Sequence, residues 1–189
     1  MKKVIYIMLI ALFSIISLNE AKAQCDAGFT PTTYQVTIGS CLYNVTICLQ
    51  CNVAYPSRIG TYIYYSKVNS NCVQLLNDWE VNSKIYNDLY SAIRLNSLCG
   101  LPGPCGVSPR TWRVQEPRCF YKDIDGGVQN CDVETYCEYE ISICWDPIKN
   151  VFVRTKTLIA SFGYMCTIFW ETNPPIGECF YYNENCPSE

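Results

Sequence analysis

Residues 41–48 read Cys41-Leu-Tyr-Asn-Val-Thr-Ile-Cys48, and residues 137–144 repeat the pattern as Cys137-Glu-Tyr-Glu-Ile-Ser-Ile-Cys144. In both segments a tyrosine and two β-branched aliphatic residues occupy every second position. This period of two is typical of a β-strand with one face buried and the other facing solvent. The two segments therefore predict two equivalent strands in a mainly β, disulfide-rich fold.

The resemblance continues downstream of these segments, because a Cys-Phe-Tyr triplet follows each of them, at Cys119 and at Cys179. Five cysteines correspond in order, with Cys41, Cys48, Cys105, Cys119 and Cys131 matching Cys137, Cys144, Cys166, Cys179 and Cys186. Self-similarity in a fixed order predicts a duplication, and chance matching among abundant cysteines and aromatic residues is the alternative. We expect two related small β modules, residues 24–131 and 132–189.

The first module is longer than the second because of an insert, which we expect to be helical over about residues 73–98. Asn82 is a candidate N-cap for a helix over residues 83–95. Its apolar stripe would consist of Ile85, Tyr86, Leu89, Tyr90 and Ile93, at spacings of three and four residues. We expect this helix to lie across the sheet and fill the core.

The remaining segments favour strands and tight turns. Residues 34–38, 62–65, 138–145 and 151–158 have the composition of strands. Residues 146–150, Asp-Pro-Ile-Lys-Asn, form a good hairpin loop, since the proline fixes φ early and Asn150 tolerates a left-handed exit. Residues 125–127, Asp-Gly-Gly, predict another tight turn.

Fourteen cysteines and no histidine define the chemistry of the chain. We expect all of the cysteines to belong to a disulfide framework: Cys25, Cys41, Cys48, Cys51, Cys72, Cys99, Cys105, Cys119, Cys131, Cys137, Cys144, Cys166, Cys179 and Cys186. Strand geometry excludes two local pairings. Seven residues at ~3.3 Å each separate Cys41 from Cys48, and Cys137 from Cys144, by ~23 Å, whereas a disulfide needs Cα atoms within ~7 Å.

The N-terminus has the features of a bacterial-type secretory signal peptide over residues 1–23. Lys2 and Lys3 precede an apolar run, and Ala21-Lys-Ala23 provides a small-x-small cleavage pattern. The run is shorter than the ~20 residues of a spanning helix, and Gln24 before Cys25 does not suit a lipoprotein. We expect a secreted or cell-surface protein without a membrane span after cleavage.

The mature chain is mildly acidic. Removing residues 1–23, with three lysines and one glutamate, changes the net charge from −3 to −5. No basic block exists to bind phosphates, so nucleic acid is not an expected partner.

Three catalytic or metal-binding alternatives can be stated. Cys48-Leu-Gln-Cys51 is a CxxC motif, which would make the chain a thiol–disulfide protein. Glu138, Glu140, Glu171 and Glu178 are carboxylates that a hydrolase acting on glycans could use. Asp123, Asp125 and Glu134 resemble part of a calcium loop, although the glycine expected at position six is Val128.

Without histidine, the chain lacks the commonest general base and metal ligand. We predict no catalytic residues, no cofactor and no metal site. The expected function is that of a disulfide-stapled binding or structural protein, whose partner is an extracellular protein or a glycan.

Overall fold

The computed structural model describes residues 25–52, 56–69, 71–131, 134–163, 176, 179–181 and 186. The predicted signal peptide lies outside these residues. The two segments that repeat each other both form long strands, β2 (Cys41–Gln50) and β7 (Tyr136–Asp146). Each is half of a hairpin, with β1 (Thr30–Ile38) before β2 and β8 (Val151–Ser161) after β7.

The turn of each hairpin contains a residue with a positive φ. Residues 39 and 40 connect β1 to β2, and Gly39 adopts a φ of 61°, as a two-residue hairpin turn requires. In the turn before β8, Asn150 has a φ of 55°, so the prediction of a left-handed exit is confirmed. The Asp146 carboxylate accepts hydrogen bonds from the backbone N–H groups of Ile148 and Lys149, at 3.0 and 3.1 Å.

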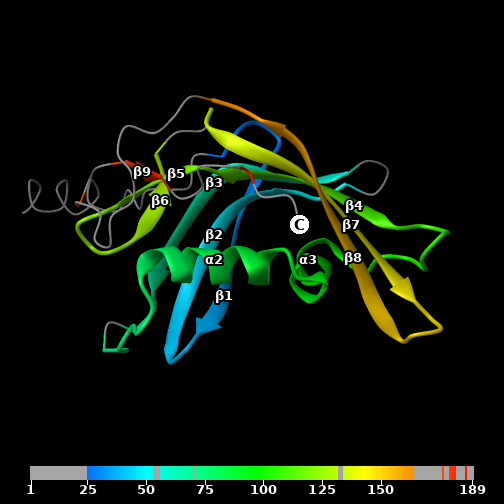
Figure 1. The fold of residues 1–189 in the computed structure, drawn as a ribbon, viewed down its shortest axis with the longest axis horizontal. Helices are drawn as coiled ribbons and strands as arrows, with labels where there is room; N and C mark the ends of the chain where they lie inside the picture. Colours follow the sequence, from blue (N-terminus) through cyan, green and yellow to red (C-terminus); the bar gives the residue numbers. More distant parts are fainter. Residues whose placement is uncertain are drawn as a thin grey trace, which may run out of the picture.

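One mixed, nine-stranded sheet contains all the strands of the described residues (Figure 1). The others are β3 (Ser57–Lys67), β4 (Arg110–Pro117), β5 (Cys119–Lys122), β6 (Val128–Asn130) and β9 (Phe180–Tyr181). The order runs β8-β7-β4-β3-β6-β5-β9, and β2 pairs with the other edge of β3.

The sheet branches at β3. One edge of β3 pairs with β2 along most of its length. On the other edge, Ser57–Ile59 pair in parallel with β4, and Tyr64 and Tyr65 pair in antiparallel with β6. Strand β3 therefore joins the β1–β2 hairpin to both remaining parts of the sheet.

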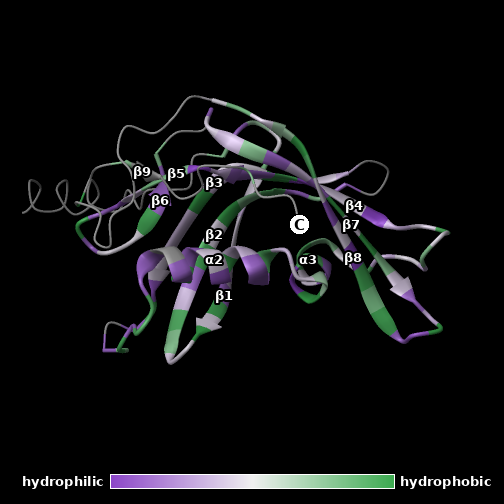
Figure 2. Ribbon diagram, viewed as in Figure 1, coloured by the Kyte–Doolittle hydropathy of each residue, from purple (hydrophilic) through white to green (hydrophobic). Residues whose placement is uncertain are grey.

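Two helices lie across one face of the sheet and enclose the core (Figure 1). They are α2 (Asp78–Leu89) and α3 (Ala92–Cys99). Bands of different hydropathy alternate along β2 (Figure 2), and the residues at its alternate positions, such as Val45 and Ile47, are fully buried. Trp112, Val114 and Ile141 extend the same apolar layer across β4 and β7.

The helical insert is confirmed, but its predicted boundaries are wrong. Asn77, not Asn82, caps α2 in a capping box: its Oδ1 accepts from the Glu80 N–H at 2.9 Å, and its own N–H donates to the Glu80 carboxylate at 3.0 Å. Asn82 is instead buried within α2. Helix α2 starts five residues before the predicted position, because this reciprocal pair satisfies backbone N–H groups of its first turn.

The single predicted helix is also divided in two. The chain leaves the helix at Tyr90, and the hydroxyl of Ser91 caps α3 by accepting from the Arg94 N–H at 3.1 Å. Ile85, Tyr86, Leu89 and Tyr90, which precede the change of direction, are buried as expected. Ile93, which follows it, is 79% exposed. Ile93 was therefore wrongly assigned to the core stripe.

Arg94 fastens α3 to the edge of the sheet. Its guanidinium pairs with Asp88 of α2 at 2.8 Å, donates to the Gln35 carbonyl of β1 at 2.9 Å, and lies 4.3 Å from the centre of the Tyr34 ring. One side chain thus ties two helices to β1.

The prediction of two related modules is not confirmed. β4, from the predicted first module, pairs along its whole length with β7 of the second, so strands of both predicted modules belong to one sheet. The disulfides do not follow the correspondence either. In the predicted correspondence, Cys137 matches Cys41 and Cys186 matches Cys131. Because Cys137 bonds to Cys186, the repeat would require a bond between Cys41 and Cys131, but Cys41 bonds to Cys72.

Candidate functional site

The cysteines form a framework of long-range bonds. The described disulfides are Cys25–Cys48, Cys41–Cys72, Cys51–Cys99, Cys105–Cys144, Cys131–Cys179 and Cys137–Cys186. Cys119 is disulfide-bonded as well, and Cys166 lies outside the described residues. Cys41 and Cys48 bond to different partners, as do Cys137 and Cys144.

These bonds fall into two groups along the chain. All six cysteines from Cys25 to Cys99 pair with one another, and the other three described bonds join residues from Cys105 onward. The first group encloses β1, β2, β3 and both helices. The covalent division of the chain therefore lies between Cys99 and Cys105.

The CxxC alternative is wrong. Cys48 bonds to Cys25, and Cys51 bonds to Cys99. A redox CxxC pair must form a disulfide within itself and expose a reactive thiolate, whereas these two cysteines hold different parts of the first group together. Their role in the structure is to staple β2 and the loop after it.

The acidic loop at residues 123–127 is a tight turn between β5 and β6. The Asp123 carboxylate accepts from the backbone N–H of Gly127 at 2.6 Å, and Gly126 has a φ of 80°. The described residues contain no group of three or more Cys, Asp or Glu side chains arranged to hold a metal ion. The Asp123 carboxylate stabilises the turn directly.

The predicted carboxylates are not brought together by the described part of the chain. Glu138 lies 3.9 Å from Arg113, on the side of the sheet opposite the helices. Glu140 lines an open cleft, and Glu171 and Glu178 lie outside the described residues. Glu140 is the only carboxylate among the described residues that line this cleft, whereas glycoside hydrolysis uses a pair.

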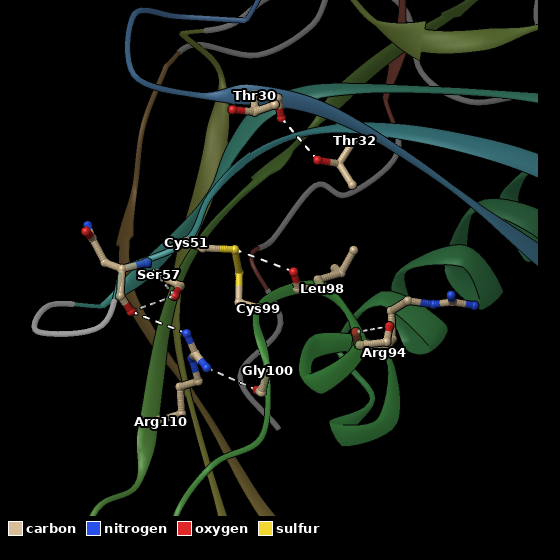
Figure 3. The surroundings of a disulfide bond; sticks show 11 residues. Thr30, Thr32, Cys51, Ser57, Arg94, Leu98, Cys99, Gly100 and Arg110 are labelled. Atoms are coloured by element: carbon tan, nitrogen blue, oxygen red, sulfur yellow. Dashed lines mark hydrogen bonds between the residues drawn. A yellow bond between two sulfur atoms is a disulfide. The ribbon is translucent and has the colours of Figure 1, made fainter.

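That cleft has a volume of about 600 Å³, and Cys99 of the Cys51–Cys99 disulfide is among its lining residues. Figure 3 shows the residues around this disulfide. Its wall combines the proline-rich loop after α3 with the start of β4. The lining residues include Asn52, Leu101, Pro102, Ser108 and Pro109. The size is that of a small-molecule site, but Arg110, the one cationic residue among the described residues that line it, is engaged within the protein.

Arg110 is held by hydrogen bonds to backbone carbonyls of two loops. Its guanidinium donates to the Gly100 carbonyl at 3.1 Å and to the Asn52 carbonyl at 3.4 Å (Figure 3). Ser57 Oγ accepts from the Asn52 N–H at 3.1 Å. Arg110 therefore connects the loop before β3 to the loop after α3, alongside the disulfide, and acts as a structural clamp.

A cluster of ionisable side chains is buried between the helices and the sheet. Glu116 of β4 is only 4% exposed, and the Tyr90 hydroxyl donates to its carboxylate at 2.6 Å. Burial raises the pKa of Glu116 above its ordinary value, while the Tyr90 hydrogen bond and the Lys156 charge oppose that rise. Lys156 lies 4.1 Å from the centre of the Tyr139 ring and 5.0 Å from that of Tyr90.

The face of the sheet opposite the helices carries a continuous set of uncharged polar side chains. One cross-strand row follows the residue pairing through five strands: Thr33, Thr46, Tyr64, Gln129 and Tyr121. A shorter row beside it contains Gln35, Asn44 and Ser66. These eight residues and Tyr62, two positions before Tyr64 on β3, are called here the neutral face.

The neutral face is accessible and locally ordered by its own hydrogen bonds. All nine of its residues are exposed or half-buried. The hydroxyls of Thr33 and Thr46 lie 2.8 Å apart, and the Gln35 amide donates to the Asn44 side chain at 3.0 Å. Tyr64 and Tyr121 both pair with Gln129, and Tyr62 is two positions from Tyr64, so the three tyrosines lie close together. Burial and these two neighbouring phenols raise the pKa of Tyr62.

The sequence predicts a strand within this surface but not the surface itself. The segment Tyr62–Tyr65 was a candidate strand, and its tyrosines divide between the two faces: Tyr65 is buried, whereas Tyr62 and Tyr64 are not. Tyr121 was missed, because only the pairing of both Tyr64 and Tyr121 with Gln129 brings the three tyrosines together. The period-two pattern predicts which face of the sheet each side chain occupies, but not which side chains lie next to it on the adjacent strands.

No protein-family model matches the chain, and no curated protein or solved structure is significantly similar to it. Neither α2 nor α3 has the length and apolar character of a membrane-crossing helix, and the described residues include no other candidate. Mainly β structure with many disulfides is consistent with an oxidising, extracellular environment.

Proposed function

We propose that the chain is a secreted or cell-surface binding protein without catalytic activity, and that it binds through the neutral face. Residues 1–23 would be removed during export. The partner belongs to the extracellular environment, where the disulfides are stable. The framework of long-range bonds suits this function, because it adds covalent restraints to the apolar core and so holds the sheet in one shape.

The observation that carries the proposal is the cluster of Tyr62, Tyr64 and Tyr121 on the solvent side of the sheet. Tyrosine provides a large contact area at a low cost in conformational entropy and a hydroxyl that donates and accepts hydrogen bonds. Other tyrosines, such as Tyr43, Tyr86 and Tyr90, fill the core. The three on the neutral face are half-buried, so part of each side chain is accessible to a ligand.

The test is binding of the oxidised mature protein to intact cells and to extracellular material of the producing organism. Saturable binding that falls at least about tenfold in the Tyr62→Ala/Tyr121→Ala double variant would support the proposal. Tyr136→Ala is the matched control, since Tyr136 is a half-buried tyrosine on the same side of the sheet, packed on Phe162 at 4.8 Å between ring centres. Equal binding by all three proteins, or none by the wild type, would contradict it.

A further inference from the structure

The charge distribution on the outer side of the sheet restricts what the neutral face can bind. None of its nine residues is charged. The charged residues on the same side lie around it: Arg58 nearer the start of β3, and Arg113, Glu138 and Glu140 on β4 and β7. The Asp123 carboxylate lies at its border, close to the Tyr64 hydroxyl in the turn at Gly127. A nucleic acid, an acidic peptide or a sulfated polysaccharide would need cationic partners. The neutral face provides none, so its ligand is uncharged.

The hydrogen-bonding groups narrow the chemistry further. Five hydroxyls of threonine and tyrosine, the Ser66 hydroxyl and three carboxamides can each both donate and accept. The Thr33–Thr46 and Gln35–Asn44 contacts use one donor each, so every pair keeps further donors and acceptors. A ligand that matches such a surface must itself present many groups that donate and accept, as the hydroxyls of a sugar do.

The aromatic rings supply the remaining contact. Tyr62, Tyr64 and Tyr121 are amphipathic, with an apolar ring and a polar end. The C–H faces of a pyranose ring pack on such rings while its hydroxyls reach the polar groups beside them. Protein partners favour an interface centre from which water is excluded by apolar side chains. No aliphatic residue lies among the nine positions of the neutral face, and the nearest ones on this side, Leu42 and Val68, lie at its border beyond Asn44 and Ser66.

The dimensions of the face suit an oligomer better than a single sugar. The longer row crosses five paired strands, or about 19 Å at ~4.8 Å between neighbouring strands. A twisted sheet presents this row as a shallow, elongated strip. Successive sugar units could contact successive strands along it.

We infer that the neutral face binds an uncharged oligosaccharide or polysaccharide, with the sugar rings stacked on Tyr62, Tyr64 and Tyr121. This inference rests on the proposed function and specifies the ligand class of the same face. Gly127 maintains the arrangement, because a Cβ at that position would lie 2.5 Å from the Tyr64 hydroxyl and 2.7 Å from its ring.

The experiment is calorimetric titration of the oxidised mature protein with neutral oligosaccharides of glucose, xylose and mannose, in parallel with oligomers of uronic acids. We expect at least one neutral series to bind, with affinity that rises with chain length. The affinity should change less than about twofold between 0.05 and 0.5 M NaCl, since no charges take part. Binding of uronic-acid oligomers alone, or a steep salt dependence, would overturn the inference.

Variants locate the site. Tyr62→Ala and Tyr121→Ala should each weaken binding at least about tenfold, Thr46→Lys should weaken it while leaving all three rings in place, and Tyr136→Ala should leave it unchanged. Tyr62→Phe keeps the ring if truncation disturbs the fold, and should retain most of the affinity. Unchanged affinity in Tyr62→Ala and Tyr121→Ala would overturn the inference.

The two proposals fail differently. If cell-surface binding depends on the tyrosines but every neutral oligosaccharide fails to bind, the ligand class is wrong and the binding face stands. A protein partner whose binding is weakened by the tyrosine substitutions would give the same result. If cell-surface binding is insensitive to the tyrosines, both proposals fall.

Discussion

The hydroxyl of Tyr90, at the end of α2, donates a 2.6 Å hydrogen bond to the buried carboxylate of Glu116 on β4. This contact joins the helical layer to the centre of the sheet. It also places an acidic group where burial penalises its charged form. The stability of the protein should therefore depend on the protonation of a residue in its core.

Glu116→Gln should change the pH dependence of unfolding. Because the folded-state pKa of Glu116 is raised above 4.5, the wild type loses stability as the pH rises from that value through the folded-state pKa. The glutamine variant keeps an acceptor for Tyr90 and lacks this loss. Chemical unfolding should show that the free energy of unfolding of the variant, relative to that of the wild type, is higher at pH 8 than at pH 4. An equal difference at both pH values would contradict the raised pKa of Glu116.

Tyr90→Phe should act in the opposite direction. It removes the donor to Glu116, and the hydrogen bond from Tyr90 lowers the pKa of that carboxyl. The buried carboxylate would then lose a partner, at a cost of about 1–3 kcal/mol. We expect a larger destabilisation at pH 8 than at pH 4, measured by the same unfolding method.

Asn77→Ala should destabilise the protein by about 1 kcal/mol, since it removes the N-cap of α2. Asn77→Ser keeps a capping oxygen and should retain most of the stability. Thermal unfolding monitored by circular dichroism measures both. Equal effects of the alanine and serine variants would show that the capping box contributes nothing.

Replacing both Cys51 and Cys99 by serine should cost up to about 4 kcal/mol, because that disulfide closes a long loop. Arg110 bridges the same two loops, so Arg110→Met should be more harmful in the absence of the disulfide than in its presence. Guanidinium unfolding of the four proteins gives the coupling. Simple additivity would mean that the clamp and the disulfide act independently.

The mature protein should begin at Gln24 when it is produced with its N-terminal segment in an exporting bacterial host. The reason is the small-x-small pattern at Ala21–Ala23 after an apolar run. Intact-mass measurement of the secreted product checks the position. A product that retains residues 1–23 would contradict the predicted cleavage.

Strand positions were predictable because burial on one face leaves a mark on the sequence. Tyr43, Val45 and Ile47 in β2, and Tyr139, Ile141 and Ile143 in β7, are all buried as their alternation indicates. The Asn77–Glu80 capping box is also visible in the sequence. It was missed because Asn82 fitted the start of the apolar stripe equally well.

Pairing between distant segments could not be predicted in the same way. Only two residues of β3, Tyr64 and Tyr65, pair with β6, and such short contacts leave no pattern of their own. Strand geometry excluded the pairing of Cys41 with Cys48, but Cys72 and Cys25 become their partners only once the chain has folded. The neutral face depends on these same long-range contacts.

The division of the disulfides between Cys99 and Cys105 has a consequence for biosynthesis. A chain is delivered from its N-terminus, so every partner required by Cys25 through Cys99 is present before Cys105 arrives. The three disulfides of the first group can therefore form while the rest of the chain is still being exported. The order of arrival sorts the cysteines into two smaller pools, and mispairing across the boundary is limited by time as well as by geometry.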